Sequence, residues 1–254
     1  SSSWKNVSLS ARALYDLDDF WSLFGSVSQA FRAPNLDDLT GSQFALNGLD
    51  SNGSPNVDPE TYLTSELGSR FENDTLTFQL GGYYTFINDG IIVIDDGAGG
   101  LVTTNGSEGY IYGFEAIGAW KFQPQWELAA QIAWQDGKQK EGGIEDTIRR
   151  MHPLMGSVSL TWTHPSDDFW VTARVAATTH QNNLSSLAAS DTQRIPINGT
   201  PGSLIPSIYA GWQVRENLQL GLALENLTDE DYRIHGSGQN AAGLNATLSA
   251  KLEW

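Results

Sequence analysis

The sequence predicts an all-β fold, an antiparallel transmembrane β-barrel in which residues 1–254 form a single domain with about eleven strands. Three observations predict it. Apolar and polar residues alternate along short segments, as in strands with one face in lipid and the other in a polar lumen. Short and long connections between the segments alternate along the chain, and aromatic residues cluster beside the short connections.

The alternation is clearest in the last segment, where Ala246, Leu248, Ala250, Leu252 and Trp254 alternate with polar residues. A period of two places successive side chains on opposite faces of a strand. No stretch of helical length shows the competing 3.6-residue period. In chain order, the expected strands are Val7–Tyr15, Trp21–Val27, Leu63–Phe71, Leu76–Phe86, Tyr112–Phe122, Leu128–Trp134, Leu154–Trp162, Phe169–Val175, Ile208–Val214, Leu218–Leu224 and Ala246–Trp254.

The connections indicate which end of each strand meets which side of a membrane. Outer-membrane barrels have tight turns on the periplasmic side and longer loops outside, whereas a β-sandwich is not expected to separate them so strictly. Aromatic rings beside the tight turns suit the headgroup level. The short connections are Asp16–Asp19, Glu72–Asp74, Gln123–Gln125, His164–Asp168 and Arg215–Asn217, and the long ones are Phe31–Glu60, Asn88–Gly109, Asp136–Pro153, Thr178–Gly202 and Asn226–Gly243.

Composition excludes several other classes of protein. The longest purely aliphatic run, Ile91–Ile94, is far too short for a membrane-spanning helix. The absence of cysteine excludes disulfides and thiol chemistry. The net charge of −16 argues against nucleic acid as a partner, because binding phosphates needs a basic surface. The acidic loops are better explained by solubility than by a mouth that attracts cations.

The strand count carries a further expectation. With an odd number of strands, Ser1 and Trp254 lie on opposite sides of the membrane. Single-chain bacterial barrels have an even number of strands and both termini in the periplasm. We therefore expect that at least one strand precedes Ser1, because Trp254 falls on the side of the short turns.

Six short stretches stand in a fixed order along the chain: Phe31–Gly41, Asn56–Glu60 followed by Glu66–Gly68, Gly113–Glu115, Asp191–Pro196, Gly199–Gly202, and Glu225–Arg233 with its continuation His235–Gly238. In this order they resemble stretches of TonB-dependent outer-membrane receptors. One departure is Val57, where the family often has proline.

The resemblance implies a barrel of about twenty-two strands with a plug domain in its lumen. This chain would be the C-terminal half of that barrel, without the plug. The implied function is energy-coupled uptake of a scarce small-molecule nutrient, such as an iron–siderophore, haem or cobalamin. The implied setting is the outer membrane of a Gram-negative bacterium. The partners would be outer-membrane lipid, the TonB complex through the plug, and the barrel assembly machinery, whose recognition signal the terminal Trp254 resembles.

Four residues in or at the base of the long connections are candidate ligand contacts: Arg32, His180, Arg194 and His235. For Arg32 the favoured alternative is an anchor of its loop beside Pro34, and for the two histidines it is a solvated surface position. Haem receptors of this family can use loop histidines as axial ligands, so a ligand contact at His180 or His235 stays an alternative.

The sequence predicts no catalytic residues, no metal site and no cofactor, and hence no enzyme. Ser237 lacks the frame of a nucleophile elbow. Glu115 and Glu127 are explained as polar residues of a lumen wall. Two rival functions remain at this point: a passive porin-like diffusion barrel, and a soluble β-sandwich or propeller that acts on carbohydrate.

Overall fold

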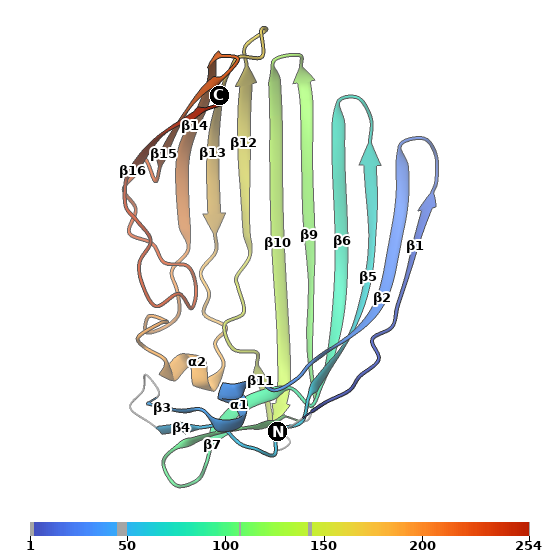
Figure 1. The fold of residues 1–254 in the computed structure, drawn as a ribbon, viewed down its shortest axis with the longest axis vertical. Coiled ribbons are helices and arrows are strands. Elements are labelled where there is room, and N and C mark those ends of the chain that lie inside the picture. Colours follow the sequence, from blue (N-terminus) through green and yellow to red (C-terminus); the bar gives the residue numbers. More distant parts are fainter. Residues whose placement is uncertain (1–2, 45–49, 107, 142–143, 254) are drawn as a thin grey trace.

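A computed structural model describes residues 3–44, 50–106, 108–141 and 144–253. One long antiparallel sheet dominates it, and eleven strands follow one another in chain order across this sheet (Figure 1). The predicted fold class and strand number are therefore confirmed. The eleven strands are β1 (Ser10–Asp16), β2 (Trp21–Arg32), β5 (Glu60–Glu72), β6 (Leu76–Asn88), β9 (Glu108–Gln123), β10 (Trp126–Glu141), β12 (Met155–Thr163), β13 (Phe169–Thr178), β14 (Ser203–Arg215), β15 (Leu218–Glu225) and β16 (Asn245–Leu252).

The long connections contain structure that the alternation did not predict. Strand β11 (Ile144–Thr147) extends the sheet locally by pairing with β10. A second, four-stranded sheet has the order β3-β4-β8-β7. Its strands are β3 (Ser42–Phe44), β4 (Asp50–Asn52), β8 (Leu101–Asn105) and β7 (Ile91–Asp95), and the two short helices are α1 (Leu36–Thr40) and α2 (Ser186–Ser190). Within the described residues, no helix has the length and apolar character needed to cross a membrane.

The two kinds of connection lie at opposite ends of the sheet, as predicted. Figure 1 shows the tight turns at the top and the long connections, with both helices and the small sheet, at the bottom. The backbone N–H of Glu253 donates to the carbonyl of Asn217 in a tight turn, at 3.0 Å. The last strand therefore runs toward the end with the tight turns. Trp254 itself lies outside the described residues.

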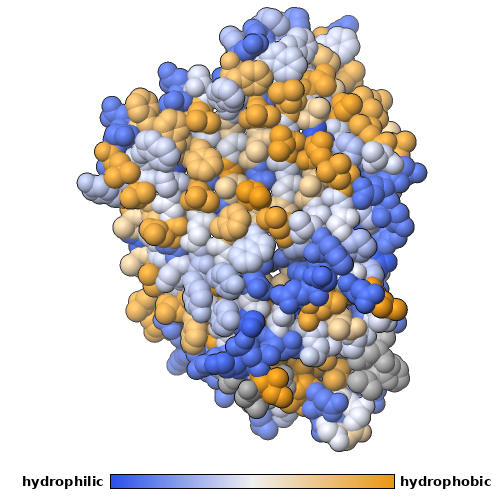
Figure 2. Space-filling view, turned by 180° about the vertical axis from the view of Figure 1, so that it is seen from behind, coloured by the Kyte–Doolittle hydropathy of each residue, from blue (hydrophilic) through white to orange (hydrophobic). Residues whose placement is uncertain are grey.

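The two faces of the sheet differ in polarity. Pairing aligns Phe78, Gly118, Ala130, Val158 and Val175 in one row across five strands, so the apolar stripes of neighbouring strands share a face. Many of these side chains are exposed in the isolated chain. Figure 2 shows the apolar side chains gathered over the strand region of the molecule. Such a face requires lipid around it.

Aromatic side chains form two bands on the sheet. The predicted band beside the tight turns includes the pairs Trp120–Phe122 and Trp162–Phe169, with ring centroids 5.5 and 6.2 Å apart. A second band, which was not predicted, lies toward the long connections. There Tyr112 and Trp134 pack edge to face, with ring centroids 5.5 Å apart. Trp120 and Tyr112 are about 27 Å apart along β9. That span is comparable with the apolar band of an outer-membrane barrel, which is about 25 Å tall.

Gly68 has a steric role on the polar face. It pairs with Phe24 of β2, and the ring of Phe24 lies over it. A Cβ atom at Gly68 would overlap both this ring and the backbone oxygen of Leu80. Gly113 stands in the same relation to the ring of Tyr83. Two of the motif glycines therefore make room for aromatic rings that line the lumen.

Replacing Gly68 with alanine is expected to lower the free energy of unfolding by about 1–3 kcal/mol, because the backbone of Leu80 has to move as well as the ring. The matched control is Gly25→Ala, since a Cβ atom there would lie 3.5 Å from its nearest neighbour. Urea titration of the detergent-solubilised protein compares the two variants. Equal midpoints would show that the close approach is unimportant.

The core of the molecule sits in the connections rather than in the sheet. The sheet is a single layer, and almost every buried residue lies at its loop end. Apolar examples are Val57, Leu101, Met151, Ala188 and Ile195, and polar examples are Glu60, Gln181, Asp191, Thr200, Asn226 and His235. The long connections are thus packed against one another and present a preformed surface.

Candidate functional site at the loop end of the sheet

Asp191 is the centre of a cluster of charged residues in this packed region. It caps the end of α2, where its backbone N–H donates to the carbonyl of Ala188, and its side chain is only 5% exposed. Its Oδ2 atom lies 3.0 Å from Nη2 of Arg149, 3.2 Å from Nη1 of Arg194 and 3.7 Å from Nη2 of Arg150. We call these four residues the Asp191 cluster.

The Asp191 cluster links two of the five long connections by ion pairs and contacts a third. Arg149 and Arg150 come from the connection between β11 and β12, whereas Asp191 and Arg194 belong to the one between β13 and β14. The connection between β15 and β16 packs against them, because a Cβ atom at Gly236 would lie 3.2 Å from the side chain of Arg150. The cluster therefore fixes the relative positions of segments far apart in the sequence.

Electrostatics within the cluster favour the charged form of Asp191 and disfavour that of Arg150. Burial by itself would raise the pKa of the Asp191 carboxyl, but hydrogen bonds from Arg194 and Arg149 outweigh it and hold this pKa below its usual value. For Arg150 the pKa is lowered, first by burial and then by repulsion from Arg149 and Arg194. The single carboxylate does not compensate all three guanidinium groups.

His235 lies inside the loop core rather than facing outward, which corrects its expected placement. It is 7% exposed, and its Nδ1 atom is 2.8 Å from the hydroxyl of Thr200. Burial, followed by the nearby His152 and Arg150, lowers the pKa of His235. The ring is held between two connections, because it is buried and its hydrogen-bond partner Thr200 belongs to the connection before its own. Direct contact with a ligand would require these connections to separate.

The lowered pKa of His235 predicts that the loop core loosens in acid. The unfolded segment binds a proton more readily than the folded one, so this stability is present above the ordinary histidine pKa of about 6.5 and declines as pH falls below it. Hydrogen exchange of residues 226–243, corrected for the intrinsic rate, should be faster at about pH 5.5 than at about pH 7.5. His235→Gln should remove most of that difference, and an unchanged difference would assign it to other groups.

His180 is exposed at the start of the same connection as Arg194. Its Nε2 atom is 3.1 Å from the carbonyl of Asn198, so one ring nitrogen is engaged with the backbone. Among the described residues, no group of three or more His, Asp or Glu side chains is placed to hold a metal ion.

Arg32 lies at the other side of the loop end, where β2 ends and β5 begins. It pairs with Glu60 and, at 2.9 Å, with Asp38 of the capping box that starts α1. Glu60 is 5% exposed and also accepts from Tyr62 and from the backbone N–H of Ile91. This geometry is that of a loop anchor, the alternative favoured for Arg32. The four candidate residues thus fall into two groups rather than one.

Arg149, Arg150 and Asp191 were not among the predicted site residues. The sequence holds two weak signals for them: the Arg149-Arg150 doublet in a chain with 14 basic residues, and the place of Asp191 as the first residue of the stretch Asp191–Pro196. Nothing in the sequence shows that these positions meet, because 40 residues separate the doublet from its carboxylate partner.

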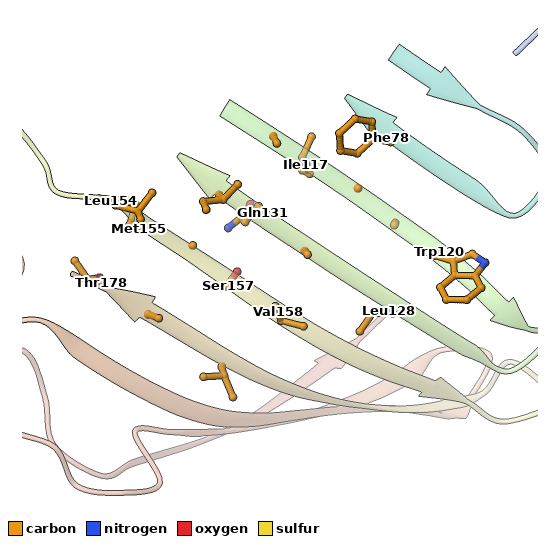
Figure 3. Close-up of a pocket in the computed structure, with 18 of the residues that line it drawn as sticks. Phe78, Ile117, Trp120, Leu128, Gln131, Leu154, Met155, Ser157, Val158 and Thr178 are labelled. Carbon is orange, nitrogen blue, oxygen red and sulfur yellow. The ribbon is translucent and has the colours of Figure 1, made fainter. Parts of the chain in front are cut away.

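Opposite faces of the sheet each carry a cavity near its middle. On the polar face a cavity of about 470 Å³ is lined by Glu66, Glu115, Gln131 and Arg174, which confirms a polar lumen wall. On the apolar face a groove of about 670 Å³ has small residues at its floor and larger ones such as Phe78, Trp120, Leu128 and Val158 around it (Figure 3). The groove lies between the two aromatic bands, at the depth of the lipid chains.

Comparisons with known proteins agree with this architecture. Residues 1–227 match the family model described as "TonB dependent receptor-like, beta-barrel". The vitamin B12 transporter BtuB of Vibrio vulnificus is 28% identical over 224 residues, which are 87% of this chain and 32% of that protein. An iron-regulated outer membrane virulence protein of Vibrio cholerae is 26% identical over 164 residues, which are 59% of this chain and 25% of that protein.

Solved structures show the same fold. The copper transporter OprC superposes with a TM-score of 0.80 at 19% identity, covering 96% of this chain and 39% of that one. The ferric enterobactin receptor PfeA of Pseudomonas aeruginosa gives a TM-score of 0.72 at 15% identity, covering 97% and 40%. The chain spans about a quarter to two-fifths of the lengths of these proteins. By its sequence match and by its fold, the chain belongs to the TonB-dependent receptor β-barrel family, a family of outer-membrane transporters of Gram-negative bacteria and not of enzymes.

Proposed function

We propose that this chain forms part of the wall and outer loops of a receptor that takes up a scarce small-molecule nutrient by TonB-dependent transport. The loops capture the nutrient outside the cell, and a plug domain that interacts with the TonB complex releases it through the lumen. The observation that carries the proposal is a lipid-facing, single-layer sheet whose buried residues are concentrated in loops at one end. Such loops hold a fixed shape without a ligand, which lowers the entropic cost of binding.

The candidate ligands are an iron–siderophore, haem or cobalamin, and the names of the similar proteins include vitamin B12, ferric enterobactin and copper. Three of the four candidate contact residues, Arg32, His180 and Arg194, have side chains that reach solvent at the loop end. We propose that they contact the nutrient. His235 joins them only in a state with separated loops.

Uptake measurements test the proposal. The complete gene that encodes this chain is expressed in a Gram-negative host that lacks its own receptors, and accumulation of labelled iron–siderophores, haem and cobalamin is followed with and without a functional TonB. We expect accumulation of at least one nutrient, and its loss when TonB is removed. Equal accumulation without TonB would identify a passive diffusion barrel instead. A chain that needs no detergent to stay soluble would exclude both.

Trp254 is proposed to act in assembly, as a signal read by the barrel assembly machinery and as an interface anchor. Trp254→Ser should lower the amount of folded protein in the outer membrane severalfold without a matching fall in total synthesis. The control is Lys251→Ser, which alters a polar position of β16 close to the same end of the chain. The fraction that keeps a heat-modifiable electrophoretic mobility measures assembly, and an unchanged fraction would argue against this role.

A further inference from the structure

We propose that Arg149, Arg150 and Arg194 form an oxyanion site, which binds a carboxylate or phosphate group at the loop end of the sheet. If the anion belongs to the transported nutrient, the site identifies that nutrient as anionic, and this part of the inference rests on the proposed function. The same chemistry is offered by the phosphates of the membrane surface, so the source of the anion is an outcome of the test below.

The charge balance of the Asp191 cluster points to an anion. Three guanidinium groups surround one carboxylate, and among the described residues these arginines form ion pairs with Asp191 alone. The cluster therefore carries a net charge of about +2 inside a chain whose net charge is −16. Positive charge concentrated in this way raises the local concentration of anions.

A purely structural role for the cluster does not need all three arginines. Arg149, from the neighbouring connection, and Arg194, from the same connection as Asp191, hold its Oδ2 atom at 3.0 and 3.2 Å. Arg150 lies at 3.7 Å, beyond ordinary hydrogen-bond length, and is repelled by both of its neighbours. Burial and this repulsion thus raise the free energy of its charged form, and a bound anion would lower it again.

The donor groups are available to a ligand. Each guanidinium has five N–H donors in a planar fork that matches carboxylate and phosphate oxygens. Arg149 and Arg194 each use one donor on Asp191, and both side chains remain 39% and 35% exposed. Arg150 is 42% exposed. The site is therefore fixed at its buried carboxylate and open toward solvent.

The experiment measures anion binding by the complete receptor in an uncharged detergent, with inorganic pyrophosphate and citrate as soluble probes. Arg150→Gln removes one charge while leaving the two shorter contacts to Asp191 in place. We expect about tenfold weaker binding of at least one probe, and recovery of much of this loss in Arg150→Lys. Arg215→Gln removes the same charge at the opposite end of the sheet and should leave affinity unchanged. Binding should also weaken as salt is raised.

A second arm identifies the source of the anion. The receptor is placed in nanodiscs of phosphatidylcholine with or without phosphatidylglycerol, and thermal unfolding of the wild type and of Arg150→Gln is compared. Stabilisation by the anionic lipid that depends on Arg150, without binding of soluble probes, assigns the site to headgroup phosphates. Binding of soluble probes assigns it to a ligand from solution.

Two results would overturn the inference. One is that neither the affinity for the soluble probes nor the stabilisation by anionic lipid depends on Arg150. The other is that Arg150→Gln and Arg215→Gln lower the affinity for the probes equally. Either result is distinguishable from failure of the proposed function, because anion binding needs neither TonB nor transport. A receptor that transports a neutral nutrient and binds no anion would contradict the anion site but not the proposed function. A receptor that binds anions but accumulates no nutrient would contradict only the proposed function.

Discussion

Replacing Asp191 with asparagine is expected to loosen the packing of the three long connections that meet at the Asp191 cluster. The change leaves three partly buried guanidinium groups without their counter-charge. Removing one partner of a buried ion pair costs about 3–5 kcal/mol, and the partial exposure of the arginines reduces this to about 2–3 kcal/mol of local stability. Asparagine keeps the size of the side chain, so the loss is electrostatic rather than steric.

Hydrogen exchange by mass spectrometry measures this effect in residues 148–153, 181–200 and 226–243. Exchange should rise roughly thirtyfold or more in all three segments together, as a 2–3 kcal/mol loss implies. The matched control is Asp167→Asn, because Asp167 lies in a tight turn at the other end of the sheet. Adding Arg150→Gln to Asp191→Asn should recover part of the protection. Faster exchange in one segment alone would mean that the cluster does not couple the connections.

Replacing Ala130 with arginine is expected to lower the stability of the barrel in a membrane by about 2–4 kcal/mol. Ala130 lies on the apolar face, opposite Gly118 and Val158 and between the two aromatic bands. A guanidinium group there is placed near the middle of the lipid, far from either headgroup layer. The strand cannot rotate to hide it, because pairing on both sides fixes which face Ala130 occupies.

Gln131→Arg provides the matched control for Ala130→Arg. The same charge is added one residue further along β10, on the face that lines the polar cavity with Glu66 and Glu115. It should be tolerated, since two carboxylates are near and water is accessible. The folded fraction in lipid vesicles across a urea series compares the two variants. An equal loss of folded protein in both variants would contradict the assignment of Ala130 to the lipid-facing side and Gln131 to the lumen side.

The strands were predictable because a local pattern determines them. Alternation along β6 or β10 follows from which face meets lipid, and every residue of such a strand repeats the same signal. The positions of the tight turns followed in the same way. The small sheet of β3, β4, β7 and β8 escaped prediction because strands of three to five residues hold too few alternations, and β4 and β8 pair across 50 residues.

The candidate site was less predictable for a related reason. Arg194 was found through its motif, but its partners Asp191 and Arg149 meet it only through the packing of separate connections. The position of His235 depends likewise on Thr200, 35 residues away. Burial in a loop core has no periodic signature in sequence, so an inward-facing histidine and an outward-facing one look the same there.

The sequential order of the strands determines how a wall of this kind can change in size. Each of the eleven long strands pairs with the long strands next to it in chain order, and β10 also pairs with the short β11. Inserting or deleting one hairpin of two strands would therefore leave every other pairing intact and keep each terminus on its original side of the membrane. A single added strand would reverse the orientation of all that follow it. Barrels with this meander order can thus grow by gene duplication of hairpins, in steps of two strands.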